Sequence, residues 1–159
     1  MKKQTCCIFG HRKINLSDEQ KELLKTRIEN LIAKEGVRTF LFGSRSQFDD
    51  LCLSLVSELH EKYPYVKRVY VRAEYPIITQ EYENYLLRRY DETYFPKSVA
   101  QAGRARYVER NYIMIDNSNV CLIYYDENCE KKVSGTYRAY NYAEKKGRKI
   151  INVFSRECK

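Results

Sequence analysis

Three short turns of this sequence carry residue types that can hold a phosphate group. They are Gly10-His11-Arg12, Gly43-Ser44-Arg45 and Ser134-Gly135-Thr136, each a glycine beside hydroxyl or cationic side chains. Where such a turn opens a helix, its free backbone N–H groups and the positive end of the helix dipole favour a bound anion. We therefore predict that these turns hold a phosphate-bearing ligand.

Two of these assignments have a competing structural explanation. Gly10 also suits a plain turn after the apolar run at residues 5–9, in which case His11 and Arg12 are only solvated cations. Asp49 follows the Gly43 turn and is a further candidate for ligand binding. A carboxylate in the first turn of a helix, however, also simply complements the helix dipole. The sequence leaves both alternatives open.

The elements that position these turns alternate along the chain. Apolar, β-prone runs near residues 5–9, 37–42, 67–72, 120–125 and 149–154 predict five strands, with helical periodicity between them. This alternation predicts an α/β fold with a mostly parallel five-stranded sheet covered by helices on both faces. In open sheets of this kind ligands bind at the carboxyl ends of the strands, where the first two turns lie.

Local signals also mark helix boundaries. Ser17 followed by Gln20 three residues later matches a capping box and predicts a helix start. Gly36 predicts the end of that helix, and Gly147 predicts the end of the last helix.

A tyrosine-rich insertion at about residues 73–97 interrupts the alternation. Residues 82–89 within it resemble a short helix, and Pro76 and Pro96 bracket the segment. Its tyrosines and arginines suit stacking on nucleobases. They equally suit packing of the insertion onto the body with the hydroxyls left in water. We expect one domain over residues 1–159 that includes this insertion.

The composition narrows the functional classes. The chain has 159 residues and a formal charge of +8, from 29 basic and 21 acidic residues. That excess fits a basic cleft for a small anion, whereas the scattered basic residues disfavour a nucleic-acid surface. The sequences GxGxxG and GxxxxGK[ST] are absent, which excludes the standard dinucleotide and P-loop fingerprints.

The six cysteines and two histidines do not form a metal-ligand pattern. No CxxC pair occurs, so we predict structural thiols in a reducing compartment and no metal site. The N-terminal apolar run is too short for a signal-peptide core, and no run approaches the length of a membrane span. We therefore expect a cytoplasmic protein that does not enter the membrane and has no cofactor beyond a nucleotide-like ligand.

Four segments together resemble the SLOG superfamily, and within it the DUF1273 branch of uncharacterised bacterial proteins with YpsA-like members. They are CCIFGHR, FGSRSQFD, RNYIMIDNSN and SGTYRAYNYAEKKGRKIINVF, and they span nearly the whole chain. The resemblance implies a Rossmann-like three-layer α/β/α sandwich that binds nucleotides or nucleotide-derived ligands. Because SLOG relatives often pair, it also implies a homodimer.

The LOG phosphoribohydrolases of this superfamily allow a comparison residue by residue. Arg110, with Asn111 beside it in the RNYIMIDNSN segment, matches the LOG arginine that precedes the fourth strand. Gly135 and Thr136 match the Gly-Thr of the LOG phosphate loop PGGxGTxxE. The final Glu of that motif falls on Ala139, which can neither accept a hydrogen bond nor carry a charge. The resemblance thus implies that phosphate binding is kept and that LOG-type hydrolysis is lost.

These observations predict a nucleotide-binding protein, with two alternatives. The first alternative is an N-glycosidase acting on nucleoside phosphates, in which Glu109, Asp49 or Asp126 replaces the missing glutamate. The second is a DNA-associated protein like DprA, another SLOG relative. The alanine at position 139 disfavours the first, and the lack of a dense basic patch disfavours the second.

Overall fold

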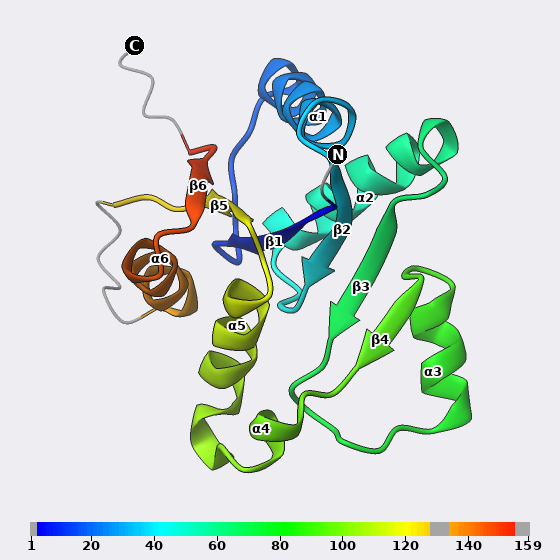
Figure 1. The fold of residues 1–159 in the computed structure, drawn as a ribbon, viewed down its shortest axis with the longest axis vertical. Coiled ribbons are helices and arrows are strands. Elements are labelled where there is room, and N and C mark those ends of the chain that lie inside the picture. Colours follow the sequence, from blue (N-terminus) through cyan, green and yellow to red (C-terminus); the bar gives the residue numbers. More distant parts are fainter. Residues whose placement is uncertain (1–2, 128–133, 155–159) are drawn as a thin grey trace.

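Six parallel strands form a single sheet in the computed structural model, which describes residues 3–127 and 134–154 (Figure 1). The strand order is β4-β3-β2-β1-β5-β6, and every neighbouring pair is parallel. The strands are β1 (Gln4–Gly10), β2 (Val37–Phe42), β3 (Lys67–Val71), β4 (Glu92–Tyr94), β5 (Val120–Tyr124) and β6 (Lys149–Asn152). The predicted α/β class and parallel sheet are therefore confirmed.

The sheet has one strand more than the five that the sequence predicts. The additional strand, β4, lies inside the tyrosine-rich insertion and pairs with β3, with Val69 opposite Glu92. It has only three residues, which is too short to show the period-2 alternation by which strands are recognised. Together with β3, most of the insertion thus forms a further β-α-β unit that extends the sheet by one edge strand.

Six α-helices and one 3₁₀ turn connect these strands within the described residues. They are α1 (Asp18–Ala33), α2 (Gln47–Lys62), α3 (Gln80–Leu87), α4 (Lys97–Ala100), the 3₁₀ turn η1 (Gly103–Ala105), α5 (Arg106–Asp116) and α6 (Gly135–Lys145). The capping box of Ser17 and Gln20 is present as predicted, and Ser46 and Ser134 cap α2 and α6 through their hydroxyls. Gly36 and Gly147 adopt positive φ at the predicted helix ends.

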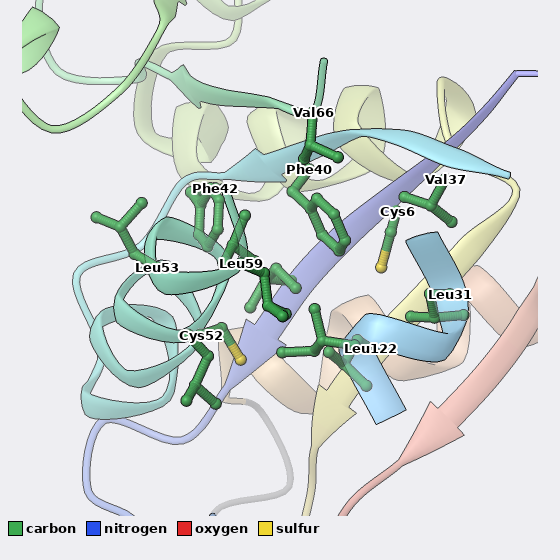
Figure 2. Close-up of a cluster of buried hydrophobic side chains, with 14 of the residues drawn as sticks. Cys6, Leu31, Val37, Phe40, Phe42, Cys52, Leu53, Leu59, Val66 and Leu122 are labelled. Atoms are coloured by element: carbon green, nitrogen blue, oxygen red, sulfur yellow. The ribbon is translucent and has the colours of Figure 1, made fainter. Parts of the chain in front are cut away.

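Each face of the sheet is covered by its own group of helices. Alternate strand residues face opposite sides, so Ile8 packs toward α1 and α2 while Phe9 packs toward α5 and α6. Figure 2 shows part of the first core, where Phe40 and Leu122 of the sheet meet Leu59 of α2. The molecule is therefore the predicted three-layer sandwich, with α1, α2 and α3 on one face and α5 and α6 on the other.

The strand order places a topological switch point between β1 and β5. From β1 the chain adds β2, β3 and β4 in one direction, then returns to place β5 and β6 on the other side of β1. The connections therefore diverge to opposite faces at the carboxyl ends of β1 and β5, which is where ligands bind in open α/β sheets. The residues that follow these strands come from the first predicted turn and from the loop after Tyr124.

The described cysteines are buried and free. They are Cys6, Cys7, Cys52 and Cys121, while the cysteines at 129 and 158 lie outside the described residues. Burial raises the pKa of the Cys7 thiol well above its ordinary value, so this thiol stays protonated at neutral pH.

None of the helices in residues 3–127 and 134–154 is long and apolar enough to cross a membrane.

Candidate functional site

The three predicted turns lie along the carboxyl edge of the sheet. Gly10 is the last residue of β1, Gly43 follows β2 directly, and Gly135 opens α6 after β5. Helix α5 links the second and third turns. Arg110 Nη1 donates to the Gly43 carbonyl at 2.8 Å, and a Cβ built on Gly135 would lie 4.0 Å from Asn111 Nδ2.

The first turn is joined to the end of β5 instead. The His11 backbone N–H donates to the Tyr124 carbonyl at 3.3 Å, and the Asp126 backbone N–H donates to His11 Nε2 at 2.9 Å. Burial lowers the pKa of His11, which fits a neutral ring whose Nε2 accepts a hydrogen bond. His11 therefore fixes the start of the loop between β5 and α6, at the switch point.

The glycines at the first two turns are required by close packing. Neither Gly10 nor Gly43 has a positive φ, so the conformational freedom considered for Gly10 is not used. A Cβ on Gly10 would lie 2.4 Å from Phe48 Cβ, and a Cβ on Gly43 would lie 2.8 Å from Arg110 Cδ and Met114 Sδ. The strand ends can therefore meet α2 and α5 only if these residues have no side chain.

Arg110 is the most unusual charged residue of this edge. Its side chain is buried at 3% exposure, and its Nε donates to Asn111 Oδ1 at 2.9 Å. Burial lowers its pKa, although Tyr70, Glu74 and Asp49 oppose that shift. No carboxylate of the described residues lies within 4.0 Å of the guanidinium, so a buried cation lacks an ion-pair partner there.

Asp49 holds the second turn in shape. Ser44 Oγ and Ser46 Oγ donate to its Oδ1 at 3.0 and 2.9 Å, and the Gly43 N–H donates to its Oδ2 at 3.4 Å. Burial raises the pKa of Asp49 to about 7, and these three hydrogen bonds act against that shift. Its carboxylate therefore orders the turn as well as starting α2, which supports the structural interpretation left open by the sequence.

The third turn forms the N-terminus of α6. Ser134 Oγ accepts from the Tyr137 N–H at 3.1 Å, which leaves other N–H groups of the first turn without a partner inside the helix. Gly135 is exposed and Thr136 is buried at 8% exposure. This N-terminus lies beside Asn111 and so adjoins the residue that contacts Arg110.

Two predicted side chains do not join this group. Arg12 is exposed, and its backbone carbonyl accepts from the Gln47 N–H at 2.9 Å, so its backbone joins the first turn to α2. Arg45 is also exposed and donates to Tyr82 Oη at 2.8 Å on the insertion. The tyrosines of the insertion contribute to packing, since Tyr90 is buried against Phe42 and Tyr70.

Two hollows of the described residues lie away from these turns. One of about 280 Å³ is bounded by Ile14, Leu16 and α2, and another of about 300 Å³ lies between α1 and β6. Neither is lined by a predicted site residue. A ligand at the predicted turns would therefore lie along the open edge of the sheet, and residues 128–133, which connect β5 to α6, lie outside the described part of the chain.

The described residues contain no cluster of three histidine, cysteine or acidic side chains that could hold a metal ion.

The position at which LOG enzymes carry a glutamate has no acidic side chain in this protein. Ala139 is fully buried and packs in the core beneath α6. Of the three suggested replacements, Asp49 uses its oxygens within its own turn, Glu109 precedes Arg110 on α5, and Asp126 follows β5 near His11.

Sequence reasoning missed the residues that support this edge from below. Phe48 and Met114 press against Gly10 and Gly43, and Tyr70 lies at the end of β3 beside Arg45. All three belong to apolar patterns and look like ordinary core residues in sequence. Only their position at the carboxyl edge distinguishes them.

The comparison with protein families agrees with the sequence resemblance. The YpsA family profile, described as the YspA SLOG family, matches residues 2–157. None of the curated proteins matches the chain. The match covers all three turns, helix α5 and the insertion.

Proposed function

Because the chain belongs to the YspA SLOG family, we propose that it binds a nucleotide or nucleotide-derived ligand, with a phosphate at the carboxyl edge of the sheet. Arg110, Asn111 and the N-terminus of α6 hold the phosphate in this proposal. His11 and Asp49 keep the flanking turns in place. Six further residues of the three turns complete the site: Gly10, Gly43, Ser44, Ser134, Gly135 and Thr136.

The proposal rests mainly on the surroundings of Arg110. Arg110 is 3% exposed and has no carboxylate within 4.0 Å among the described residues, and its Nε donates to Asn111, whose Nδ2 would lie 4.0 Å from a Cβ built on Gly135 at the start of α6. Burying a charge without an ion pair is costly, so an anionic ligand beside Arg110 would be favoured. A phosphate would supply a negative charge beside Arg110 and would accept hydrogen bonds from N–H groups in the first turn of α6.

The proposal is tested by nucleotide binding to the wild type and to Arg110→Lys. Lysine keeps the charge and can still donate to the Gly43 carbonyl, but it loses the planar fork that binds phosphate oxygens. A charge-assisted hydrogen bond contributes about 1.5–3 kcal/mol, so affinity should fall about tenfold or more. A calorimetric titration with nucleoside mono- and diphosphates gives both affinities.

Arg106→Lys is the matched control, since Arg106 lies on the same helix and is exposed. It should bind as the wild type does. Circular dichroism at the assay temperature establishes that each variant is folded. The proposal fails if no nucleotide binds the wild type, or if Arg110→Lys binds every nucleotide as well as Arg106→Lys does.

The two alternatives remain less favoured. Ala139 is buried in the core and Asp49 is engaged by its own turn, which argues against LOG-type hydrolysis. Release of a free base from a nucleoside monophosphate would reverse this preference. Steeply salt-dependent binding of single-stranded DNA would favour the DprA-like alternative.

A further inference from the structure

Tyr107 is an exposed aromatic residue that lies beside the buried guanidinium of Arg110. The guanidinium carbon of Arg110 is 5.7 Å from the centroid of the Tyr107 ring, which is within the range of a cation–π contact. The guanidinium carbon of the exposed Arg106 is 5.1 Å from the same centroid. With both guanidinium groups in place, 43% of Tyr107 is still exposed. Part of its side chain is therefore open to a molecule from solvent.

The direction of α5 places Tyr107 beyond the ends of the strands. Arg110 Nη1 donates to the carbonyl of Gly43, which follows β2 at the carboxyl edge of the sheet. Past the other end of α5, the Asn119 N–H donates to the Thr5 carbonyl near the start of β1. The helix thus runs from the carboxyl edge toward the amino edge. Tyr107 precedes Arg110 by three residues and so lies about 4.5 Å farther out along the helix axis.

Tyr107, Arg110 and Asn111 share one face of α5, since residues three and four apart are neighbours on a helix. Exposure falls along this face from 43% at Tyr107 to 9% at Asn111 and 3% at Arg110. Asn111 in turn lies near the start of α6, where a Cβ built on Gly135 would be 4.0 Å from its Nδ2. The face therefore leads from an open aromatic ring inward to the residues proposed to hold the phosphate.

The second tyrosine of α5 is placed differently. Tyr112 is partly buried and stacks on Tyr142 of α6, with ring centroids 3.9 Å apart, so this pair joins two helices. Among the exposed tyrosines of the described residues, Tyr107 is the one whose ring lies within cation–π range of Arg110. Its position therefore fits contact with a ligand that is bound at Arg110.

Starting from the proposed nucleotide function, on which this step rests, we infer that Tyr107 is the platform on which the ligand's nucleobase stacks. Every nucleobase has a flat π face, and aromatic side chains bind bases by stacking on that face. The phosphate is held by Arg110, Asn111 and α6, and the base lies over the exposed part of the Tyr107 ring. Because stacking tolerates any base, Tyr107 provides affinity for a nucleotide without selecting among bases.

The spacing along α5 fits a phosphate carried on the 5′ carbon of the same nucleoside. Tyr107 and Asn111 are four residues apart, a separation of about 6 Å along the helix axis. In a nucleoside 5′-monophosphate, only the ribose separates the phosphate from the base, so one such molecule can reach both residues at once. The ligand class is therefore a 5′-nucleotide whose base and phosphate both contribute to binding.

The test compares nucleoside mono- and diphosphates with ribose 5-phosphate, which has the sugar and a phosphate but no base. Wild type should bind its tightest nucleotide at least about tenfold more tightly than ribose 5-phosphate. Tyr107→Leu removes the aromatic ring at an exposed position and should lose most of that gain, while its affinity for ribose 5-phosphate stays within about twofold of wild type. Tyr107→Phe keeps the ring and should bind every probe as the wild type does.

A second measurement reports on the stacking contact itself. The chain contains no tryptophan, so Tyr107→Trp supplies a single indole whose fluorescence reports on this position alone. Saturation with the tightest nucleotide should quench that fluorescence, because the base stacks on the indole, whereas saturation with ribose 5-phosphate should leave it unchanged. The same fluorescence with both probes would contradict a base at Tyr107.

Tyr65→Leu is the matched control. Tyr65 is also exposed and has a guanidinium carbon, that of Arg38, 4.3 Å from its ring centroid, but it precedes β3 at the amino edge of the sheet. This variant should keep the full gain from the base. If wild type binds nucleotides and ribose 5-phosphate equally, or if Tyr107→Leu keeps the gain or weakens both kinds of probe alike, the base platform is overturned and the proposed function stands. If no nucleotide binds the wild type, both proposals fail.

Discussion

Asp49 places a titrating carboxyl group inside one of the proposed binding turns. It is 2% exposed, and burial raises its pKa to about 7 from an ordinary value of 3.8. Between those two values the folded protein holds a proton that the unfolded chain has released. The contribution of Asp49 to stability is therefore fully present below about pH 4 and is lost as the pH rises through about 7.

Asp49→Asn should remove this pH dependence. Relative to wild type, the free energy of unfolding of the variant should rise with pH between about 4 and 7, by up to about 1.4 kcal/mol per pH unit. Asparagine also changes the hydrogen bonds of the turn, but that cost is the same at every pH, so the slope is the diagnostic quantity. Urea unfolding at several pH values measures it.

Asp50→Asn provides the comparison, because Asp50 is the next residue in the same first turn of α2 and is exposed. The difference between Asp50→Asn and wild type should vary little over the same pH range. If Asp49→Asn and Asp50→Asn give the same slope, the carboxyl of Asp49 is not the buried group that titrates near neutrality.

At the scale of elements, the site depends on how closely strand ends approach helices. Because Gly43 has no side chain, the end of β2 can lie against α5. Arg110 and Met114 of α5 fill the space that a side chain at position 43 would need. Gly135 starts α6 in a more open place, where the nearest atom that the described residues offer, Asn111 Nδ2, would lie 4.0 Å from an added Cβ. The two glycines therefore have opposite tolerances for a methyl group.

Gly43→Ala should lower the free energy of unfolding by about 1–3 kcal/mol, because Arg110 must move away from the new methyl group. Gly135→Ala should leave stability unchanged or raise it by up to about 1 kcal/mol, since alanine restricts the unfolded chain more than glycine does. Chemical denaturation of both variants gives the comparison. Equal destabilisation by the two substitutions would contradict the packing described for Gly43.

At the scale of the whole molecule, the insertion is continuous with the sheet. Strand β4 pairs with β3, and Leu86 of α3 lies in the same core as Phe42 and Tyr70. These contacts tie the insertion to the rest of the described residues. We propose that residues 1–159 fold as one unit.

Thermal unfolding should therefore show one cooperative transition. Tyrosine absorbance reports on all 15 tyrosines, five of which lie in the insertion, and far-ultraviolet circular dichroism reports on all helices. The two curves should coincide. An earlier transition seen by tyrosine absorbance alone would show that part of the chain unfolds separately and would contradict this prediction.

The sequence predicted much of this fold because its signals are local. Ser17 and Gln20, Gly36 and the apolar runs act over a few residues, and each favours the same local structure in many contexts. Strand β4 was not predicted because three residues among tyrosines carry no periodic signal. Its place in the sheet depends on pairing with the edge of β3.

The candidate site was predicted in part. The turns at Gly10, Gly43 and Gly135 lie on one edge of the sheet because parallel strands place their carboxyl ends together. Their side chains could not be placed this way, since burial of Arg110 and exposure of Arg12 and Arg45 depend on neighbours far along the chain.

By itself, the sequence determined the kinds and order of most elements, the helix caps and the family, since these follow from short-range patterns and from motifs read in order. Only the tertiary structure decided which polar groups lack partners among the described residues. The burial of Arg110 without a carboxylate within 4.0 Å becomes visible only when residues from several strands and helices are brought together. Burial and pairing are properties of the packed chain, so the charge that a ligand must supply is set at that level.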